Sequence, residues 1–310
     1  MAIGLRRHAP GVSLDNSRAN VRLWKLTSLL VMPLPPNGPQ LTGDCTSWSC
    51  AHAIEATQSG QFVAAGGEWR RIFPAWSYAV GRQWVWRKEI VGRMPSQGCS
   101  VGAVLRGAVE FGVLSWDEAE AAGFQYSGSL ADQWGNGGPP ERLKPMAAKH
   151  KLGVVAQLKS AADLRDAVCN GYGTAFGSDF TGGNFHTRDG RIVADNIAPR
   201  TSVNQRWHHA LCCDGYDGTA AGGPLYHIQN SWYPESHPAP IDDSPACGFW
   251  VDEASIEYIV AQGDAWAASD FQGFVERRDQ IDLFQTGHQP QEANALRLMT
   301  NQPSKTRMSP

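Results

Sequence analysis

Apolar residues recur at helical spacing directly after a loop rich in proline and glycine. The loop covers residues 33–44, and Trp48, Ala51 and Ile54 then follow one another at intervals of three residues. Such spacing places side chains on one face of a helix, and a glycine is a common signal for its end. The pattern therefore predicts a helix over residues 45–60 that starts where the loop stops.

The rest of the chain shows further helical stripes and short apolar runs bounded by turn residues. Helices are expected where an apolar stripe follows a cap, and strands where apolar runs lie between turns. Residues 123–140 are rich in glycine and proline and are expected to form a loop that crosses between two halves of the molecule. The expected helices are 103–111 (with Gly112 as its C-terminal cap), 161–168 and 252–259; the expected strands are 21–32 (or an extended arm), 154–158, 174–177, 207–216, 225–232 and 248–251.

Composition and charge exclude several classes of function. The chain has 310 residues, of which 42% are hydrophobic, so it can form one large domain or two small ones. A net charge of -3 favours neither nucleic acid nor an anionic membrane as a partner. The longest apolar run, residues 29–32, is far too short for a membrane span or a signal peptide. We therefore expect no nucleic-acid partner, no membrane contact, no transmembrane segment and no export signal.

Cys45 lies at the junction between the loop and the predicted helix. Unpaired backbone N–H groups and the helix dipole create a positive potential at such a position, which favours a thiolate over a thiol. The thiolate is the nucleophilic form of cysteine. With a histidine and an amide further along the chain, Cys45 is a candidate nucleophile of a cysteine hydrolase.

Four motifs in a fixed order extend this hypothesis. They are the Gln40…Cys45 helix start, His209-Ala210 before Gly215-Tyr216, Asn230-Ser231-Trp232, and the closing Gly248-Phe249. In order and approximate spacing, from about residue 33 to about residue 255, the chain resembles papain-like (C1-type) cysteine peptidases. The pattern is closest to bacterial and phage members without a long propeptide.

The resemblance implies an α+β, two-lobed papain-like fold, with the active site between a helical lobe and an antiparallel, barrel-like β lobe. Neither lobe is expected to fold alone, and the N-terminal arm is expected to complete the fold rather than to inhibit the enzyme. The chain then divides into the arm and lead-in loop (1–44), a helical lobe with the nucleophile (45–125), a crossover loop (126–149), a β lobe with the histidine and asparagine (150–275) and a C-terminal tail (276–310).

The resemblance also assigns chemical roles. Cys45 would attack the carbonyl carbon, and His209 would hold its proton in a thiolate–imidazolium pair and later protonate the leaving amine. Asn230 would accept a hydrogen bond from the far ring N–H of His209 and fix its orientation. Trp232 would shield that bond from water, and Gln40 with the backbone N–H of Cys45 would bind the oxyanion. No cofactor and no metal ion is implied.

Two features near the nucleophile depart from the family pattern. The step from Gln40 to Cys45 is one residue shorter than the usual family step, so Asn37 or a backbone donor is an alternative for the oxyanion position. Asp44 adjoins the nucleophile, and a carboxylate there raises the pKa of a thiol. The helix start and the histidine have to outweigh it, or the cysteine is less reactive than usual.

The histidine and the amide each have a rival in the sequence. His208 precedes His209, and neighbouring residues of a strand face opposite sides, so only one of them can face the cleft. The following Ala210 selects His209 through the resemblance. Gln229 points to the face opposite Asn230 and is the weaker choice.

The loop that starts at Gly98 corresponds to one wall of the substrate cleft in relatives. Gly98, Ser100 and Gly102 are therefore the candidate substrate-binding residues, although Val101 interrupts the usual double glycine. The same stretch matches the G-x-S-x-G nucleophile elbow of α/β-hydrolases, which makes Ser100 an alternative nucleophile. That motif needs a buried strand before it, whereas the preceding segment is polar and broken by Pro95. The serine-hydrolase hypothesis is the less favoured one.

Seven cysteines is an odd number, so at least one thiol is unpaired, and no spacing is typical of a zinc site. In the family pattern the disulfide partner of Cys99 would stand where this chain has Thr42. We therefore expect Cys99 to be a free thiol, which favours a reducing compartment, either the cytoplasm or an assembly such as a virion. The cysteines expected in the core are Cys50, Cys169, Cys212, Cys213 and Cys247.

The sequence thus predicts a thiol-dependent peptidase that hydrolyses peptide bonds of a peptide or protein substrate through an acyl-enzyme. One alternative is a peptidoglycan-cleaving or phage- or virion-associated peptidase of the same fold. Another is a catalytically silent structural module, against which the complete Cys45, His209 and Asn230 set argues. The polar tail, residues 285–310, is expected to attach to a partner subunit or a larger assembly.

Overall fold

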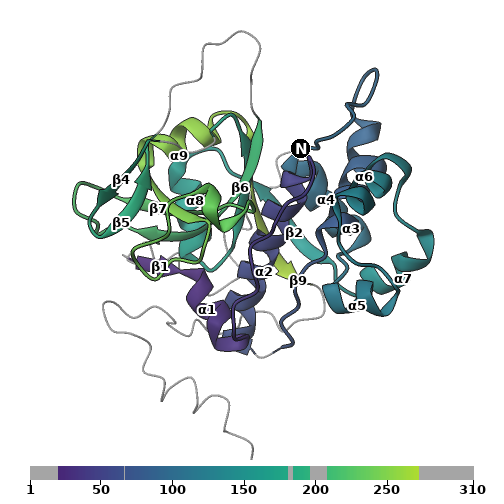
Figure 1. Ribbon diagram of the computed structural model, residues 1–310, viewed down its shortest axis with the longest axis horizontal. Helices are drawn as coiled ribbons and strands as arrows, with labels where there is room; N and C mark the ends of the chain where they lie inside the picture. Colours follow the sequence, from purple (N-terminus) through teal and green to yellow (C-terminus); the bar gives the residue numbers. More distant parts are fainter. Residues whose placement is uncertain (1–19, 66, 181–183, 196–207, 272–310) are drawn as a thin grey trace, which may run out of the picture.

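The computed structural model describes residues 20–65, 67–180, 184–195 and 208–271. Within them a helical lobe and a sheet lobe lie side by side, with the long helix α2 (Cys45–Ala65) running between them (Figure 1). The expected C-terminal tail and the start of the N-terminal arm lie outside the described residues.

The helical lobe buries a cluster of aromatic side chains behind α2. Phe73, Trp76 and Tyr78 are almost completely buried there, and Trp134 packs edge-on against Phe73. The elements of this lobe after α2 are α3 (Pro74–Ala79), a π-helical turn (Val80–Val85), a 3-10 turn (Trp86–Lys88), α4 (Val101–Phe111), α5 (Trp116–Ala121), α6 (Gly128–Gly137), a second 3-10 turn (Glu141–Leu143) and α7 (Lys144–Ala147).

The sheet lobe has its strands in the order β2-β9-β3-β6-β7-β8-β5-β4, and β1 pairs with β6. Neighbouring strands are antiparallel, except that β5 runs parallel to β8. The strands are β1 (Asn20–Arg22), β2 (Leu152–Gln157), β3 (Thr174–Ser178), β4 (Phe185–Arg188), β5 (Arg191–Ala194), β6 (His209–Asp217), β7 (Leu225–Gln229), β8 (Gly248–Asp252) and β9 (Asp264–Phe271). The helices of this lobe are α1 (Leu23–Leu30), α8 (Ala161–Cys169), α9 (Glu253–Val260) and a 3-10 turn (Pro234–Ser236).

Helix α2 belongs to a core that the two lobes share. Its buried residues Ala51 and Ile54 pack in one cluster with Ala210 and Cys212 of β6. Gly173, just before β3, comes so close to α2 that an added Cβ would overlap the backbone of the helix, so only glycine fits there. This packing brings the N-terminal end of α2 to the beginning of β6.

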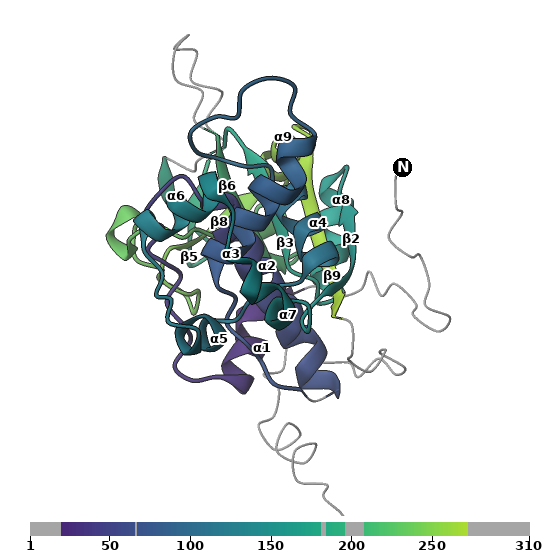
Figure 2. The same cartoon turned by 90° about the vertical axis from the view of Figure 1, so that its right-hand side faces the viewer.

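Helix α4 lies against β9, which also joins the two lobes (Figure 2). The carboxylate of Asp264 accepts hydrogen bonds from the backbone N–H groups of Val101 (2.8 Å) and Gly102 (3.0 Å) at the start of α4. These N–H groups have no partner within the helix, so a carboxylate from another element satisfies them. Trp266 covers Gly102 so closely that a side chain at this position would overlap the indole.

The expected strand over residues 21–32 is largely wrong. Only Asn20–Arg22 forms a strand, and α1 follows at once. Leu23, Trp24 and Leu26 are buried at helical spacing, so a helix buries more apolar surface there than an extended arm would.

The expected loop over residues 123–140 is also wrong for most of its length, because α6 occupies Gly128–Gly137. Ser127 caps this helix by accepting a hydrogen bond from the N–H of Leu130, and Ala131 and Trp134 face the core. The run of glycines at its end marks the C-terminal cap of the helix, since Gly138 has a φ of 89°.

The other expected helices and strands are present, with ends that differ by a few residues. Over the described ranges, no helix combines the length and the apolar character that crossing a bilayer requires. All seven cysteines are free thiols, Cys99 among them, and the five expected in the core are buried.

Candidate active site

Cys45 is the first residue of α2, and its thiol lies against the strand that carries His209. It packs at the edge of the cluster that contains Ala210. The backbone N–H of Ala210 reaches the thiol, as do the N–H groups of Cys45 itself and of Thr46. The chain therefore surrounds the sulfur with donors from the helix start on one side and from β6 on the other.

Burial nevertheless raises the pKa of the Cys45 thiol to about 11. The backbone N–H of Ala210 lowers this pKa, but the neighbouring charge of Asp44 raises it further. The sequence favoured a thiolate from the helix start alone, whereas in this structure desolvation of the charged form outweighs the helix. The free site accordingly holds a neutral thiol.

Asp44 is a fully buried carboxyl group directly before the nucleophile. It accepts a hydrogen bond from the Tyr126 hydroxyl at 2.9 Å, and that hydroxyl accepts one from Trp48 Nε1 at 3.0 Å. Burial raises the pKa of Asp44 to about 7, and the Tyr126 bond opposes this shift. The charge beside the thiol therefore changes within the physiological range of pH.

His209 and Asn230 meet at the end of two neighbouring strands, β6 and β7. His209 Nε2 lies 2.9 Å from Asn230 Oδ1, and both side chains are buried. Because Oδ1 can only accept, Nε2 carries the proton and Nδ1 of the neutral ring is left as a base. His208 is exposed, so it is His209 that lies inside the fold. No hydrogen bond joins His209 to Cys45 among the described residues.

Burial lowers the pKa of His209, and the hydrogen bond to Asn230 partly offsets this effect. The ring is therefore neutral in the free site. Both shifts, upward for Cys45 and downward for His209, oppose the expected thiolate–imidazolium pair. Catalytic hydrogen bonds are often long in the absence of substrate, and a neutral histidine beside a neutral thiol is still a competent base, which becomes the proton donor once it has taken the thiol proton.

Trp232 stacks on His209 with ring centroids 4.6 Å apart, and so covers the bond to Asn230. Its other neighbour is His237, stacked at 5.7 Å. His237 Nε2 lies 2.6 Å from Asn230 Nδ2, which makes this histidine part of the same network. Sequence reasoning missed His237, because it lies in an irregular segment seven residues after Asn230, where no periodicity or motif marks it.

The loop before α2 is anchored on the segment that carries Asn230. The N–H of Gln40 donates to the carbonyl of Ser231 at 2.7 Å, and Gly38 packs on the same carbonyl with a φ of 157°. The side-chain amide of Gln40 donates to the carbonyl of Thr42 at 2.7 Å, which leaves its second N–H for an oxyanion. Asn37, the alternative donor, is engaged with the carbonyl of Ala246.

The candidate substrate-binding residues lie at the start of α4. Gly98 has a φ of 90°, and its N–H donates to the carbonyl of Gly43, two residues before Cys45. Ser100 caps α4 by accepting a hydrogen bond from the N–H of Ala103, and Gly102 lies within the helix. The loop thus adjoins the nucleophile at Gly98, while the other two residues have structural tasks.

A polar cluster ties the two loops together at the position where the family pattern has a disulfide. Gln97 Nε2 donates to Thr42 Oγ1 at 2.6 Å, and Thr42 Oγ1 donates to Asp132 Oδ1 at 2.6 Å. Hydrogen bonds of Thr42 therefore connect the two loops at this position, in place of a disulfide from Cys99. In the part of the chain that the structure describes, no group of three His, Cys, Asp or Glu side chains could hold a metal ion.

Neither a protein-family model nor a curated protein sequence matches this chain. Solved structures do. Xylellain, a cysteine protease from Xylella fastidiosa, is 17% identical over 81% of this chain and 85% of that chain, with a TM-score of 0.53. The cysteine protease and lectin-like domains of Cwp84, a surface layer associated protein of Clostridium difficile, are 14% identical over 84% and 52% of the two chains, with a TM-score of 0.53.

Digestive procathepsin L 3 of Tenebrio molitor larval midgut is 15% identical over 85% of this chain and 72% of that chain, with a TM-score of 0.52. Similarity at such identities shows the fold alone. The chain has the two-lobed α+β fold of papain-like cysteine proteases, which confirms the fold expected from the sequence.

Proposed function

We propose that this protein is a thiol peptidase in which Cys45 is the nucleophile, His209 the general base and acid, and Asn230 the residue that orients His209. The observation that carries the proposal is the 2.9 Å bond between His209 Nε2 and Asn230 Oδ1. It leaves Nδ1 as the basic nitrogen of a ring whose next residue, Ala210, already touches the thiol. The fold shared with cysteine proteases supports the same activity.

The reaction starts from the neutral pair. As Cys45 Sγ attacks the carbonyl carbon, its proton passes to His209 Nδ1 and the carbonyl electrons move to the oxygen. The tetrahedral intermediate collapses when the C–N bond breaks and Nδ1–H protonates the leaving amine. Water then attacks the thioester while His209 takes its proton, and the carboxylic acid leaves as the proton returns to sulfur.

Asn230 and the donors around the sulfur stabilise the charged species in this sequence. The imidazolium that forms at each step keeps its Nε2–H bond to Asn230 Oδ1, which is why this bond raises the pKa of His209. We assign the oxyanion to the backbone N–H of Cys45 and to the N–H of the Gln40 side-chain amide that is not bonded to Thr42. Loss of one such donor costs about 2.7–4 kcal/mol in the barrier.

Active-site labelling combined with peptide hydrolysis tests this function. Iodoacetamide or an epoxysuccinyl probe is expected to modify Cys45, as located by mass spectrometry, and Cys45→Ala is expected to abolish both labelling and turnover. Cys99→Ser serves as the matched control, because it removes another partly exposed thiol and should retain activity. Ser100→Ala should also retain activity, because Ser100 caps a helix.

Full hydrolysis by Cys45→Ala would contradict the thiol mechanism and support the serine alternative. Failure of the intact protein both to react with the probe and to cleave a diverse peptide library would identify a catalytically silent module.

A further inference from the structure

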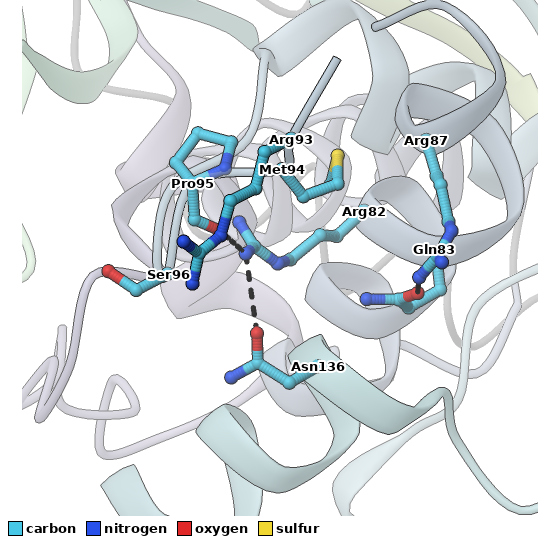
Figure 3. A pocket seen from close by; sticks show the side chains of 8 residues that line it. All are labelled: Arg82, Gln83, Arg87, Arg93, Met94, Pro95, Ser96 and Asn136. Carbon is cyan, nitrogen blue, oxygen red and sulfur yellow. Dashed lines mark hydrogen bonds between the residues drawn. The ribbon is translucent and has the colours of Figure 1, made fainter.

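A hollow of about 750 Å³ lies beside the start of α4, on the helical lobe (Figure 3). Its walls come from the π-helical turn after α3 and the 3-10 turn that follows it, from the segment before Gly98 and from the end of α6. Three arginines line it, and no aspartate or glutamate does. The lining residues are Arg82, Gln83, Arg87, Arg93, Met94, Pro95, Ser96 and Asn136.

Arg82 is a buried cation without a carboxylate partner among the described residues, although it is only 1% exposed. Its guanidinium donates to the carbonyl oxygens of Pro95, Gly98 and Gly135 and to Asn136 Oδ1. Carbonyl oxygens satisfy the N–H groups but leave the positive charge uncompensated, and a buried charge is costly unless it is paired. An anion in the pocket would provide that compensation.

Arg87 and Arg93 add two more positive charges to the same walls. Arg87 donates to Gln83 Oε1 at 3.1 Å, and neither arginine forms a salt bridge within the described part of the chain. In Figure 3 the side chains of Arg82 and Arg93 extend toward the same part of the pocket. Guanidinium groups bind carboxylates and phosphates through two parallel hydrogen bonds, so this arrangement selects for an anionic group.

The pocket lies within reach of a peptide bound at the nucleophile. The N–H of Gly98 donates to the carbonyl of Gly43 at 3.2 Å. Two residues separate Gly43 from Cys45, and two separate Gly98 from Ser96 in the pocket wall. Each of these two-residue segments spans at most about 7 Å. Ser96 is thus within about 20 Å of Cys45, a length that about six residues of extended peptide cover.

We propose that this arginine-lined pocket binds the carboxylate of an aspartate or glutamate side chain in the peptide substrate, within six residues of the scissile bond. The inference rests on the proposed peptidase function and adds a class of substrate to it, namely acidic peptides. Arg93 is the residue best suited to test it, because it is exposed and bonds to none of the catalytic side chains.

The test measures binding of matched peptides to the Cys45→Ala protein, which cannot turn them over. A single glutamate is moved through six positions on each side of a fixed cleavage sequence, and each peptide is compared with its glutamine counterpart at 0.15 M salt. At one position the glutamate peptide should bind about tenfold more tightly. Arg93→Gln should bring this ratio close to one, whereas Arg165→Gln, which removes an equal charge from α8, should leave it unchanged.

A ratio near one at every position overturns the proposal, and so does an equal loss of discrimination in Arg165→Gln, which would show a general charge effect. If inorganic phosphate raises the melting temperature of the intact protein but not of Arg93→Gln, while all ratios stay near one, the pocket takes a small free anion and the peptide proposal is wrong. Because binding is measured without catalysis, these outcomes are separate from a failure of Cys45 to act as nucleophile.

A second inference comes from the contact between His237 and Asn230. For Asn230 Nδ2 to donate to His237 Nε2 at 2.6 Å, His237 has to present an unprotonated nitrogen. Burial lowers the pKa of His237 to about 4, so the ring is neutral at ordinary pH. If the Asn230 amide were reversed, its Nδ2–H₂ would face the Nε2–H of His209, and two donors would meet. The unprotonated Nε2 of His237 accepts from Nδ2 and so holds the amide in the orientation that leaves Oδ1 for His209.

We infer that His237 is a positioning residue of the proposed peptidase, which acts on His209 only through Asn230. His237→Phe keeps a ring against Trp232 but removes the acceptor, and His237→Gln keeps an acceptor. In His237→Phe, kcat should fall about tenfold with KM unchanged. The acid limb of the pH profile should move to lower pH, because the Asn230 bond is what raises the pKa of His209.

His237→Gln should recover most of the loss, and His186→Phe, an exposed histidine in β4, should behave like the intact protein. Cys45, which contacts Ala210 and has Asp44 beside it, and His237 are titratable groups next to His209, so Asp44→Asn is included to exclude a contribution of that carboxyl to the acid limb. An unchanged kcat and acid limb in His237→Phe, with only a lower melting temperature, overturns this role. An equal loss of kcat in His237→Gln and His237→Phe would also overturn this role.

Discussion

Asp44→Asn should make the protein more stable at alkaline pH, by an amount that follows from the burial of this carboxyl group. The side chain is 0% exposed, and its Oδ1 has no hydrogen-bond partner among the described residues. Burial raises the pKa of Asp44 from 3.8 to about 7. Asparagine is isosteric and keeps an oxygen for the Tyr126 hydroxyl, so the substitution removes the charge and little else.

The size and sign of this stability difference follow from proton linkage. Between pH 4 and pH 7 the folded protein holds a proton on Asp44 that the unfolded chain releases, so the stability that this proton provides is lost as pH rises. A shift of about 3 pKa units corresponds to about 4 kcal/mol once Asp44 is ionised in both states. Between pH 5 and pH 8, where about 2 of these units are crossed, Asp44→Asn should gain about 2.7 kcal/mol over the intact protein.

Denaturant unfolding at pH 5 and pH 8 measures this difference directly. The exposed Glu110→Gln on α4 is the control, because it removes a carboxylate without burial and should show no comparable gain. The variant should also alkylate Cys45 faster at pH 8, because the charge on Asp44 raises the pKa of the thiol. If the stability difference between Asp44→Asn and the intact protein is the same at both pH values, Asp44 is ionised throughout and the burial argument fails.

Three further predictions concern the scaffold and the thiols. Gly112→Ala should lower the free energy of unfolding by more than about 2 kcal/mol in denaturant titrations, because Gly112 has a φ of 84° and a Cβ there would overlap the Ala147 carbonyl. Removal of residues 1–32 should lower the melting temperature rather than activate hydrolysis, because it deletes β1 and a buried face of α1; a many-fold rise in turnover would contradict this. Thiol titration in denaturant without reductant should find seven free thiols, and native iodoacetamide should label Cys45 well before Cys99, because burial raises the pKa of the Cys99 thiol even further; a blocked Cys99 would show a disulfide.

The parts of the site that local sequence determines could be predicted. A cysteine after a proline-rich loop marks a helix start, and the strands around His209 and Asn230 are read from apolar runs between turns. The fold followed from the order of these motifs. The segment that forms α1 was predicted as a strand, because a short apolar run fits a strand as well as a helix. Packing against the rest of the fold decides between the two.

The electrostatics of the site could not be predicted in the same way. The helix start favours a thiolate at Cys45, but how far burial opposes it depends on β6, more than 160 residues later in the chain, which lies against the sulfur. The same holds for His237, whose contact with Asn230 arises from the path of an irregular segment. Such contacts between distant segments leave no periodic signal for sequence reasoning to detect.

The hydrogen bonds from α4 to Asp264 determine how freely the two lobes can move. Opening the lobes at this contact would break the bonds from Val101 and Gly102 together, at about 1–3 kcal/mol for each polar group that stays buried without a new partner. Separation of the lobes at this contact is therefore costly, and the two hydrogen bonds hold the start of α4 on β9. For the proposed peptidase, lobes held together in this way leave the flexibility to the substrate: unfolded segments and mobile loops can adapt to the site, whereas a rigid folded domain has to unfold locally before it can be cut.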